Sequence, residues 1–170
     1  MTLLHPTPTI PAIDAAHTVS FTGFRPEKLL PTAPLHDLRE LHDLLADRLE
    51  VAIKYLYANG YTCYLTGMAE GFDLWAAEKV AKLKAELPDL TLGCILPFPG
   101  HARKGGEAYQ RILAAADFRH TVCPSSHRGA YLKRNDFLVD HSSLIICYDG
   151  CQAGGMLYTL SRPGRGGGRC

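Results

Sequence analysis

Short hydrophobic runs alternate with longer amphipathic segments along most of the chain. The short runs place apolar residues at consecutive positions, which is typical of strands buried on both faces of a sheet. We expect five such strands, over residues 17–21, 61–65, 90–96, 120–123 and 143–148. Because helical segments separate them, the pattern predicts a three-layer, Rossmann-like α/β fold in which helices flank a mainly parallel sheet.

The intervening segments carry apolar residues three and four positions apart, the spacing of an amphipathic helix. The longest runs from about Leu38 to Tyr57 and stops at Asn59-Gly60. Further helices are expected over residues 72–87, 106–116 and 131–140. After the fifth strand, we interpret residues 156–160 as the start of another helix. Pro163 and the glycines around it cannot continue that helix, so the C-terminal unit is expected to be truncated or divergent.

The two ends of the chain differ in composition from the middle. Residues 1–16 contain three prolines and neither Lys nor Arg, which predicts a disordered leader rather than an export signal. Residues 17–160 form the expected Rossmann-like domain. Residues 161–170 hold three arginines among glycines, so we interpret them as a flexible tail, with contact to phosphate as the alternative.

Charge and cysteine usage narrow the function classes. The 170 residues include 18 Lys or Arg and 17 Asp or Glu, and a net charge of +1 gives no strong signal for nucleic acid or an anionic membrane. No apolar stretch approaches the ~20 residues that span a bilayer. Six cysteines lie mostly in apolar runs without a CxxC motif, which favours a reducing, cytoplasmic compartment. The eight histidines lack metal-ligand spacing, so we expect no metal and no cofactor.

Small or glycine-containing turns follow most of the predicted strands. In an open parallel sheet, ligands bind beyond the carboxyl ends of the strands, where glycines let backbone amides approach an anion. The loop from Thr66 to Asp73 lies directly between a strand and a helix but fits neither the dinucleotide fingerprint nor the P-loop. This loop is therefore consistent both with a ligand-binding loop and with an ordinary strand-to-helix turn. The candidate ligand-binding residues are Thr22, Gly23, Arg25, Gly67, Glu70, Gly71, Asp73, Arg134 and Asn135.

Each charged candidate also has a structural interpretation. Glu70 and Asp73 either stabilise a helix N-terminus or bind a ribose hydroxyl, and Glu70 is the candidate acid–base catalyst. Arg25 follows a strand end, where it either reaches the ligand edge or is an ordinary surface arginine. Arg134 either binds phosphate or lies solvated on its helix.

The combined pattern resembles the YpsA-like branch of the SLOG superfamily, which joins DNA-processing proteins with Lonely-Guy phosphoribohydrolases. The residues that carry the resemblance are Ser20–Leu29, Thr66–Glu78, Leu96–Phe98, Lys133–Asp140, Cys147–Gly150 and Gly154-Gly155. The resemblance implies a Rossmann-like fold that binds a nucleotide-derived ligand, with Gly154 and Gly155 at the last ligand-side turn. Met156 stands where such proteins usually have Thr, and this departure removes a hydroxyl for phosphate.

Three function classes follow. The favoured one is a nucleotide-binding module, such as a sensor, in a bacterial or phage-type SLOG protein. The alternative is a hydrolase of nucleotide N-glycosidic bonds, with Glu70 as acid–base and Arg25 or Arg134 on the phosphate. The third is a non-enzymatic protein-interaction module or a degenerate copy. A homo-oligomer is also expected, because a missing C-terminal unit would leave part of the sheet uncovered.

Overall fold

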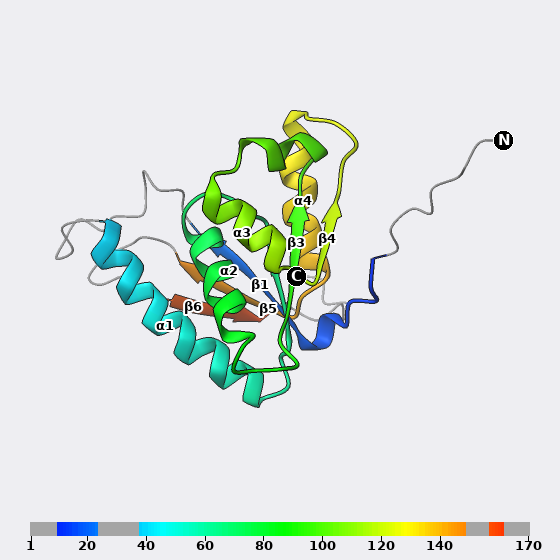
Figure 1. The fold of residues 1–170 in the computed structure, drawn as a ribbon. Helices are drawn as coiled ribbons and strands as arrows, with labels where there is room; N and C mark the ends of the chain where they lie inside the picture. The colour runs from blue at the N-terminus through cyan, green and yellow to red at the C-terminus, as the bar shows by residue number, and fades with distance from the viewer. Residues whose placement is uncertain (1–9, 24–37, 149–156, 162–170) are drawn as a thin grey trace, which may run out of the picture.

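A computed structural model describes residues 10–23, 38–148 and 157–161 (Figure 1). In chain order the elements are η1 (Ala15–His17), β1 (Thr18–Gly23), α1 (Leu38–Ala58), β2 (Cys63–Thr66), α2 (Phe72–Leu83), β3 (Thr91–Leu96), η3 (Pro99–Lys104), α3 (Glu107–Ala115), β4 (Phe118–Thr121), α4 (Arg128–Asp140), β5 (Leu144–Tyr148) and β6 (Leu157–Ser161). The five predicted strands and the four predicted helices before residue 149 are all present, with ends that differ by a few residues.

The strands form one sheet in the order β4-β3-β2-β1-β5-β6. The first five are parallel, and Ser20 of β1 pairs with Leu65 on one side and Ile145 on the other. The chain moves outward from β1 through β4 and then crosses back to place β5 on the other side of β1. The strand order therefore reverses between β1 and β5, which is where Rossmann-like sheets bind ligands.

The expected helix after residue 155 is wrong. Residues 157–161 instead form β6, which runs antiparallel to β5 and pairs Leu157 with Tyr148. Five residues before Pro163 are too few for a stable helix, whereas a strand satisfies the backbone groups along the edge of β5. The described part of the C-terminal unit is therefore an antiparallel edge strand, and the sheet remains mainly parallel.

Helices α1, α2 and α3 share one face of the sheet (Figure 1). They enclose the main core, in which Phe21, Tyr64 and Phe72 are in contact through their rings and Leu41, Leu45, Leu49 and Ile53 are fully buried along α1. The apolar stripe of α1 predicted from its spacing thus faces the sheet.

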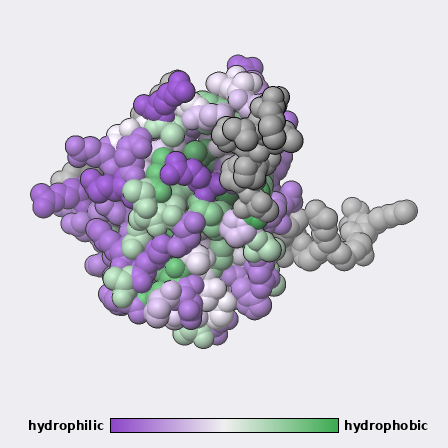
Figure 2. Space-filling model, turned by 45° about the vertical axis from the view of Figure 1, so that its right-hand side comes forward, coloured by the Kyte–Doolittle hydropathy of each residue, from purple (hydrophilic) through white to green (hydrophobic). Residues whose placement is uncertain are grey.

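Helix α4 packs on the opposite face, completing the three layers. Its Leu138 lies in a second, smaller core with Leu65 and Ile95. The side chain of Ser20 on this face hydrogen-bonds Ser142 (Oγ to Oγ, 2.9 Å), just after α4. On the face shown in Figure 2, hydrophilic side chains are interspersed with hydrophobic ones.

Part of the expected leader is described. Asp14 accepts a hydrogen bond from the Ala16 backbone (3.1 Å) at the start of η1, and Ile13 packs against the smaller core. Residues 1–9 lie outside the described residues, as does the tail after Ser161. None of the helices in the described ranges is both long enough and apolar enough to span a membrane.

Candidate functional site

The turn after β2 is held by its own side chains. The Thr66 hydroxyl accepts a hydrogen bond from the Met68 N–H (3.2 Å) and donates one to the Asp73 carbonyl (3.3 Å). Gly71 immediately precedes α2 with φ of 94°, a backbone conformation that favours glycine. Met68 also adopts a positive φ, 59°. This tight turn places Asp73 in the first turn of α2, next to the carboxyl end of the sheet.

Arg134 of α4 reaches across to that turn. It is only 7% exposed, and its Nη1 donates to the Gly67 carbonyl (3.0 Å), while Nε and Nη2 donate to Asn135 Oδ1 (3.2 and 3.1 Å). The guanidinium also lies 5.5 Å from the centre of the Tyr131 ring, within cation–π range. A fixed positive charge is thus held beside the β2 turn.

Two of the predicted glycines are required by close packing. A Cβ on Gly67 would lie 2.9 Å from Arg134 Nε, and a Cβ on Gly23 would lie 2.4 Å from the ring of Phe72. Gly23 ends β1 and Gly67 immediately follows β2, the neighbouring parallel strand, so both lie at the same edge of the sheet. Their small size lets Arg134 and α2 approach the strands.

Asp73 is a buried carboxylate with an unused acceptor. The residue is 7% exposed, and its Oδ1 has no hydrogen-bond partner among the described residues. Burial raises the pKa of Asp73 to about 7, although the nearby Arg134 charge and a hydrogen bond from the Ala69 backbone oppose this change. An unpaired buried acceptor costs free energy, so its presence in a cavity needs a reason.

The first of two adjoining cavities, here called the switch-point cavity, lies where the strand order reverses. Its volume is about 360 Å³. It is lined by Ser20, Phe21, Thr22, Gly23, Ala69, Asp73, Tyr131, Arg134, Asn135, Leu138, Val139 and Ile145. It therefore lies between α4 and the β1–β5 pair, with the start of α2 at its end.

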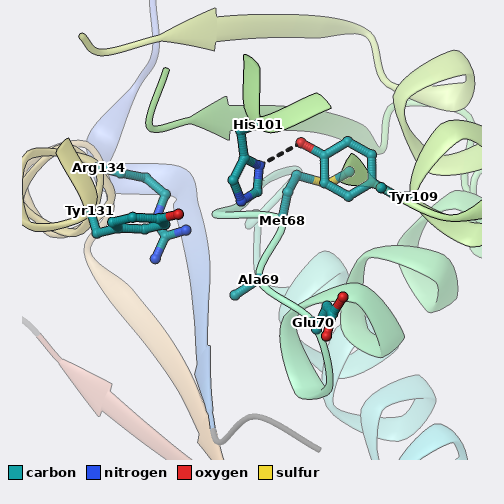
Figure 3. Close-up of a pocket in the computed structure, with 8 residues that line it drawn as sticks. Met68, Ala69, Glu70, His101, Tyr109, Tyr131 and Arg134 are labelled. Atoms are coloured by element: carbon teal, nitrogen blue, oxygen red, sulfur yellow. Dashed lines mark hydrogen bonds between the residues drawn. The ribbon is translucent and has the colours of Figure 1, made fainter. Parts of the chain in front are cut away.

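The second, here called the aromatic cavity, has a volume of about 250 Å³ (Figure 3). It is lined by Met68, Ala69, Glu70, His101, Gly105, Tyr109, Tyr131 and Arg134. Figure 3 shows that Tyr131 and Arg134 enter from α4, while His101 and Tyr109 lie opposite, joined by a hydrogen bond of 2.7 Å. Ala69, Tyr131 and Arg134 line both cavities, which are thus neighbours across a shared wall.

The predicted site residues divide into three groups. Thr22, Gly23, Asp73, Arg134 and Asn135 line the switch-point cavity, and exposed Glu70 lines the aromatic cavity. Gly67 and Gly71 shape the turn between them. Arg25, Gly154 and Gly155 lie outside the described residues.

Sequence reasoning missed His101, Tyr109 and Tyr131. Tyr131 precedes Arg134 by three positions, so helical spacing could have placed both side chains on one face. His101 and Tyr109 carry no comparable signal, because they reach the site only through the position of β3 beside β2 and the unpredicted turn η3.

The comparisons with known proteins agree on one family. A model described as the YspA SLOG family matches residues 19–163. A UPF0398 protein of Staphylococcus epidermidis is 33% identical over 142 residues, which is 78% of this chain and 72% of that protein. A UPF0398 protein of Bacillus licheniformis is 29% identical over 150 residues, 84% of this chain and 80% of that protein. The matched residues include both cavities, and the chain belongs to the YpsA family of SLOG proteins.

Proposed function

We propose that this chain binds a small anionic, nucleotide-derived ligand at the carboxyl edge of the sheet. In this proposal the ligand enters the switch-point cavity, where Asp73 accepts a hydrogen bond from a ligand hydroxyl. The positive charge of Arg134 attracts the anionic group. No step in the proposal requires a metal or a catalysed reaction.

The unused Oδ1 of Asp73 is the observation that carries the proposal. A buried carboxylate oxygen without a partner destabilises the empty protein. A ligand that donates a hydroxyl to it would remove that penalty only when bound. Sugar hydroxyls are suitable donors, and an acidic residue near this position of a Rossmann-like sheet is suited to ribose.

Charge and position support the anionic part of the ligand. The guanidinium of Arg134 and the N-terminal amides of α2 both lie at this edge, and each favours a negative group. The two cavities together fall within the ~300–1,000 Å³ typical of small-molecule sites, whereas the aromatic cavity alone does not. A mononucleotide or a somewhat larger derivative fits that space.

A ligand screen followed by calorimetry tests the proposal. Purified protein is screened by thermal shift with AMP, ADP-ribose, NAD and cyclic nucleotides, and positive compounds are titrated into the wild type and Asp73→Asn. We expect Asp73→Asn to weaken binding about 10- to 100-fold, the range for losing a hydrogen bond to a charged group. Asp136→Asn makes the same chemical change on an exposed part of α4 and serves as the control. Absence of binding by the whole panel, or equal affinity in the wild type and Asp73→Asn, would contradict the proposal.

A further inference from the structure

Four rings are locked together around the aromatic cavity. Phe98 meets His101 and Tyr131 edge-on, with ring centres 5.7 and 5.8 Å apart and planes at 89° and 90°. His101 also lies 6.2 Å from Tyr131, and its Nδ1 is hydrogen-bonded to the Tyr109 hydroxyl. Edge-to-face pairs of this kind hold rings in fixed orientations. The cavity is therefore bounded by aromatic surfaces that are positioned before any ligand arrives.

Tyr131 is the ring best suited to contact a ligand. It is 36% exposed, the largest exposure in this group of rings, and it lines both cavities. Phe98 supports it on one side, while the Arg134 guanidinium lies 5.5 Å from its ring centre. Tyr109, which lines the cavity, and Phe98, which packs against Tyr131 and His101, are both buried (3% and 5% exposed).

The chemistry of the two cavities differs. The switch-point cavity holds Asp73, which suits a sugar hydroxyl, together with the polar side chains of Asn135, Thr22 and Ser20 and the positive charge of Arg134, which suits an anionic group. The aromatic cavity is lined by rings, Met68 and Ala69, with the exposed carboxylate of Glu70 also part of its lining. A carboxylate disfavours a second anionic group there but accepts hydrogen bonds from exocyclic amines or ring N–H groups.

From this arrangement we infer that the aromatic cavity receives the planar base of the ligand, stacked on Tyr131. The sugar and the anionic group then occupy the switch-point cavity across the shared wall of Ala69 and Arg134. This inference rests on the proposed function and adds to it a base-binding subsite. Stacking recognises the face common to all bases, so it contributes affinity with little discrimination among them.

Paired titrations test the subsite separately from the proposed function. The four nucleoside monophosphates and ribose 5-phosphate, which lacks the base, are titrated into the wild type, Tyr131→Ala and Tyr131→Phe. We expect the wild type to bind at least one nucleoside monophosphate 5- to 100-fold more tightly than ribose 5-phosphate, the range for one stacked base. Tyr131→Ala is expected to remove most of that difference by weakening nucleotide binding far more than ribose 5-phosphate binding, because only the base loses its stacking partner. Tyr131→Phe, which keeps the ring, should retain the difference.

The outcomes are distinguishable. Leu132→Ala, at an exposed neighbour on α4, controls for general effects on that helix, and circular dichroism confirms that each variant is folded. Equal wild-type affinities for ribose 5-phosphate and all four nucleotides overturn the subsite and leave the proposed function standing. Equal weakening of all probes by Tyr131→Ala also overturns it. Failure of all probes to bind the wild type overturns the proposed function and the subsite with it.

Discussion

The guanidinium of Arg134 donates a 3.0 Å hydrogen bond to the carbonyl of Gly67, joining α4 to the turn after β2. Through this bond, a side chain that lines both cavities also holds the turn after β2 in place. A Cβ at position 67 would lie 2.9 Å from Arg134 Nε and 3.0 Å from its Cδ. In the binding proposal, the ligand affinity of the site and the packing of this turn therefore depend on the same residue.

Gly67→Ala should push Arg134 out of its position. We expect a loss of about 1–3 kcal/mol in the free energy of unfolding, the range for overpacking a buried position. Nucleotide affinity should fall as well, since the positive charge moves. Chemical denaturation and calorimetry measure the two effects. Gly106→Ala is the control, because a Cβ there meets no atom within 4 Å. If Gly67→Ala left both the free energy of unfolding and the nucleotide affinity unchanged, the predicted dependence of the site on the position of Arg134 would be wrong.

Asp73 should make stability fall as pH rises. Its pKa is near 3.8 in the unfolded chain and about 7 in the folded protein. Below pH 4 the carboxyl is neutral in both states, but at higher pH the unfolded state releases the proton first and is favoured. The wild type should therefore lose stability between about pH 4 and pH 7 relative to Asp73→Asn. We expect the variant to gain on the order of 1–3 kcal/mol by pH 8, measured by denaturation across the pH range.

The same variant separates function from structure. A purely structural Asp73 would stabilise the fold, so its replacement would lower stability and ligand affinity together. An acceptor retained for a ligand predicts higher stability and weaker binding in one protein. A variant that is less stable than the wild type at pH 8 would contradict the burial argument.

The binding proposal expects a bound nucleotide to remain intact. After prolonged incubation of AMP with the protein, chromatography should recover AMP without free adenine above the protein-free blank. Glu70 is exposed and lines the aromatic cavity, where the hydrolase alternative would use it as the acid–base group. Release of adenine that disappears in Glu70→Gln would replace the binding proposal with that alternative.

Helix α1 offers a surface for the expected self-association. Val51 and Tyr55 lie one turn apart and are 71% and 68% exposed. Their apolar surface favours a contact between two copies, so light scattering should give a mass above 18.6 kDa at tens of micromolar. Val51→Glu should shift the protein toward the monomer. A stable wild-type monomer at that concentration would refute the prediction.

The sequence predicted the elements more completely than the site. Consecutive apolar residues identified the parallel strands, and the three-four spacing from Leu41 to Leu56 identified the buried stripe of α1. Position after a strand also brought Asp73 and Gly67 into consideration, because carboxyl ends of parallel strands meet at one edge.

The features that the sequence did not predict depend on contacts between segments that are distant in the chain. The burial of Asp73 follows from how α2, α4 and β1 pack, and no local pattern distinguishes it from an exposed helix cap. The bond between His101 and Tyr109 requires η3 and α3 to meet beyond β3. The strand character of residues 157–161 likewise depends on the open edge of β5, which local propensity does not describe.

The antiparallel direction of β6 determines where the chain leaves the sheet. Ser161 pairs with Leu144, the first residue of β5, so β6 ends at the amino edge of the parallel strands, opposite the carboxyl edge that holds Thr22 and Gly23. A parallel sixth strand would have delivered the following residues to the cavity mouths. A fluorescent protein or immobilisation tag joined beyond β6 would therefore start from the side away from the proposed ligand edge, a position that suits surface-based binding measurements.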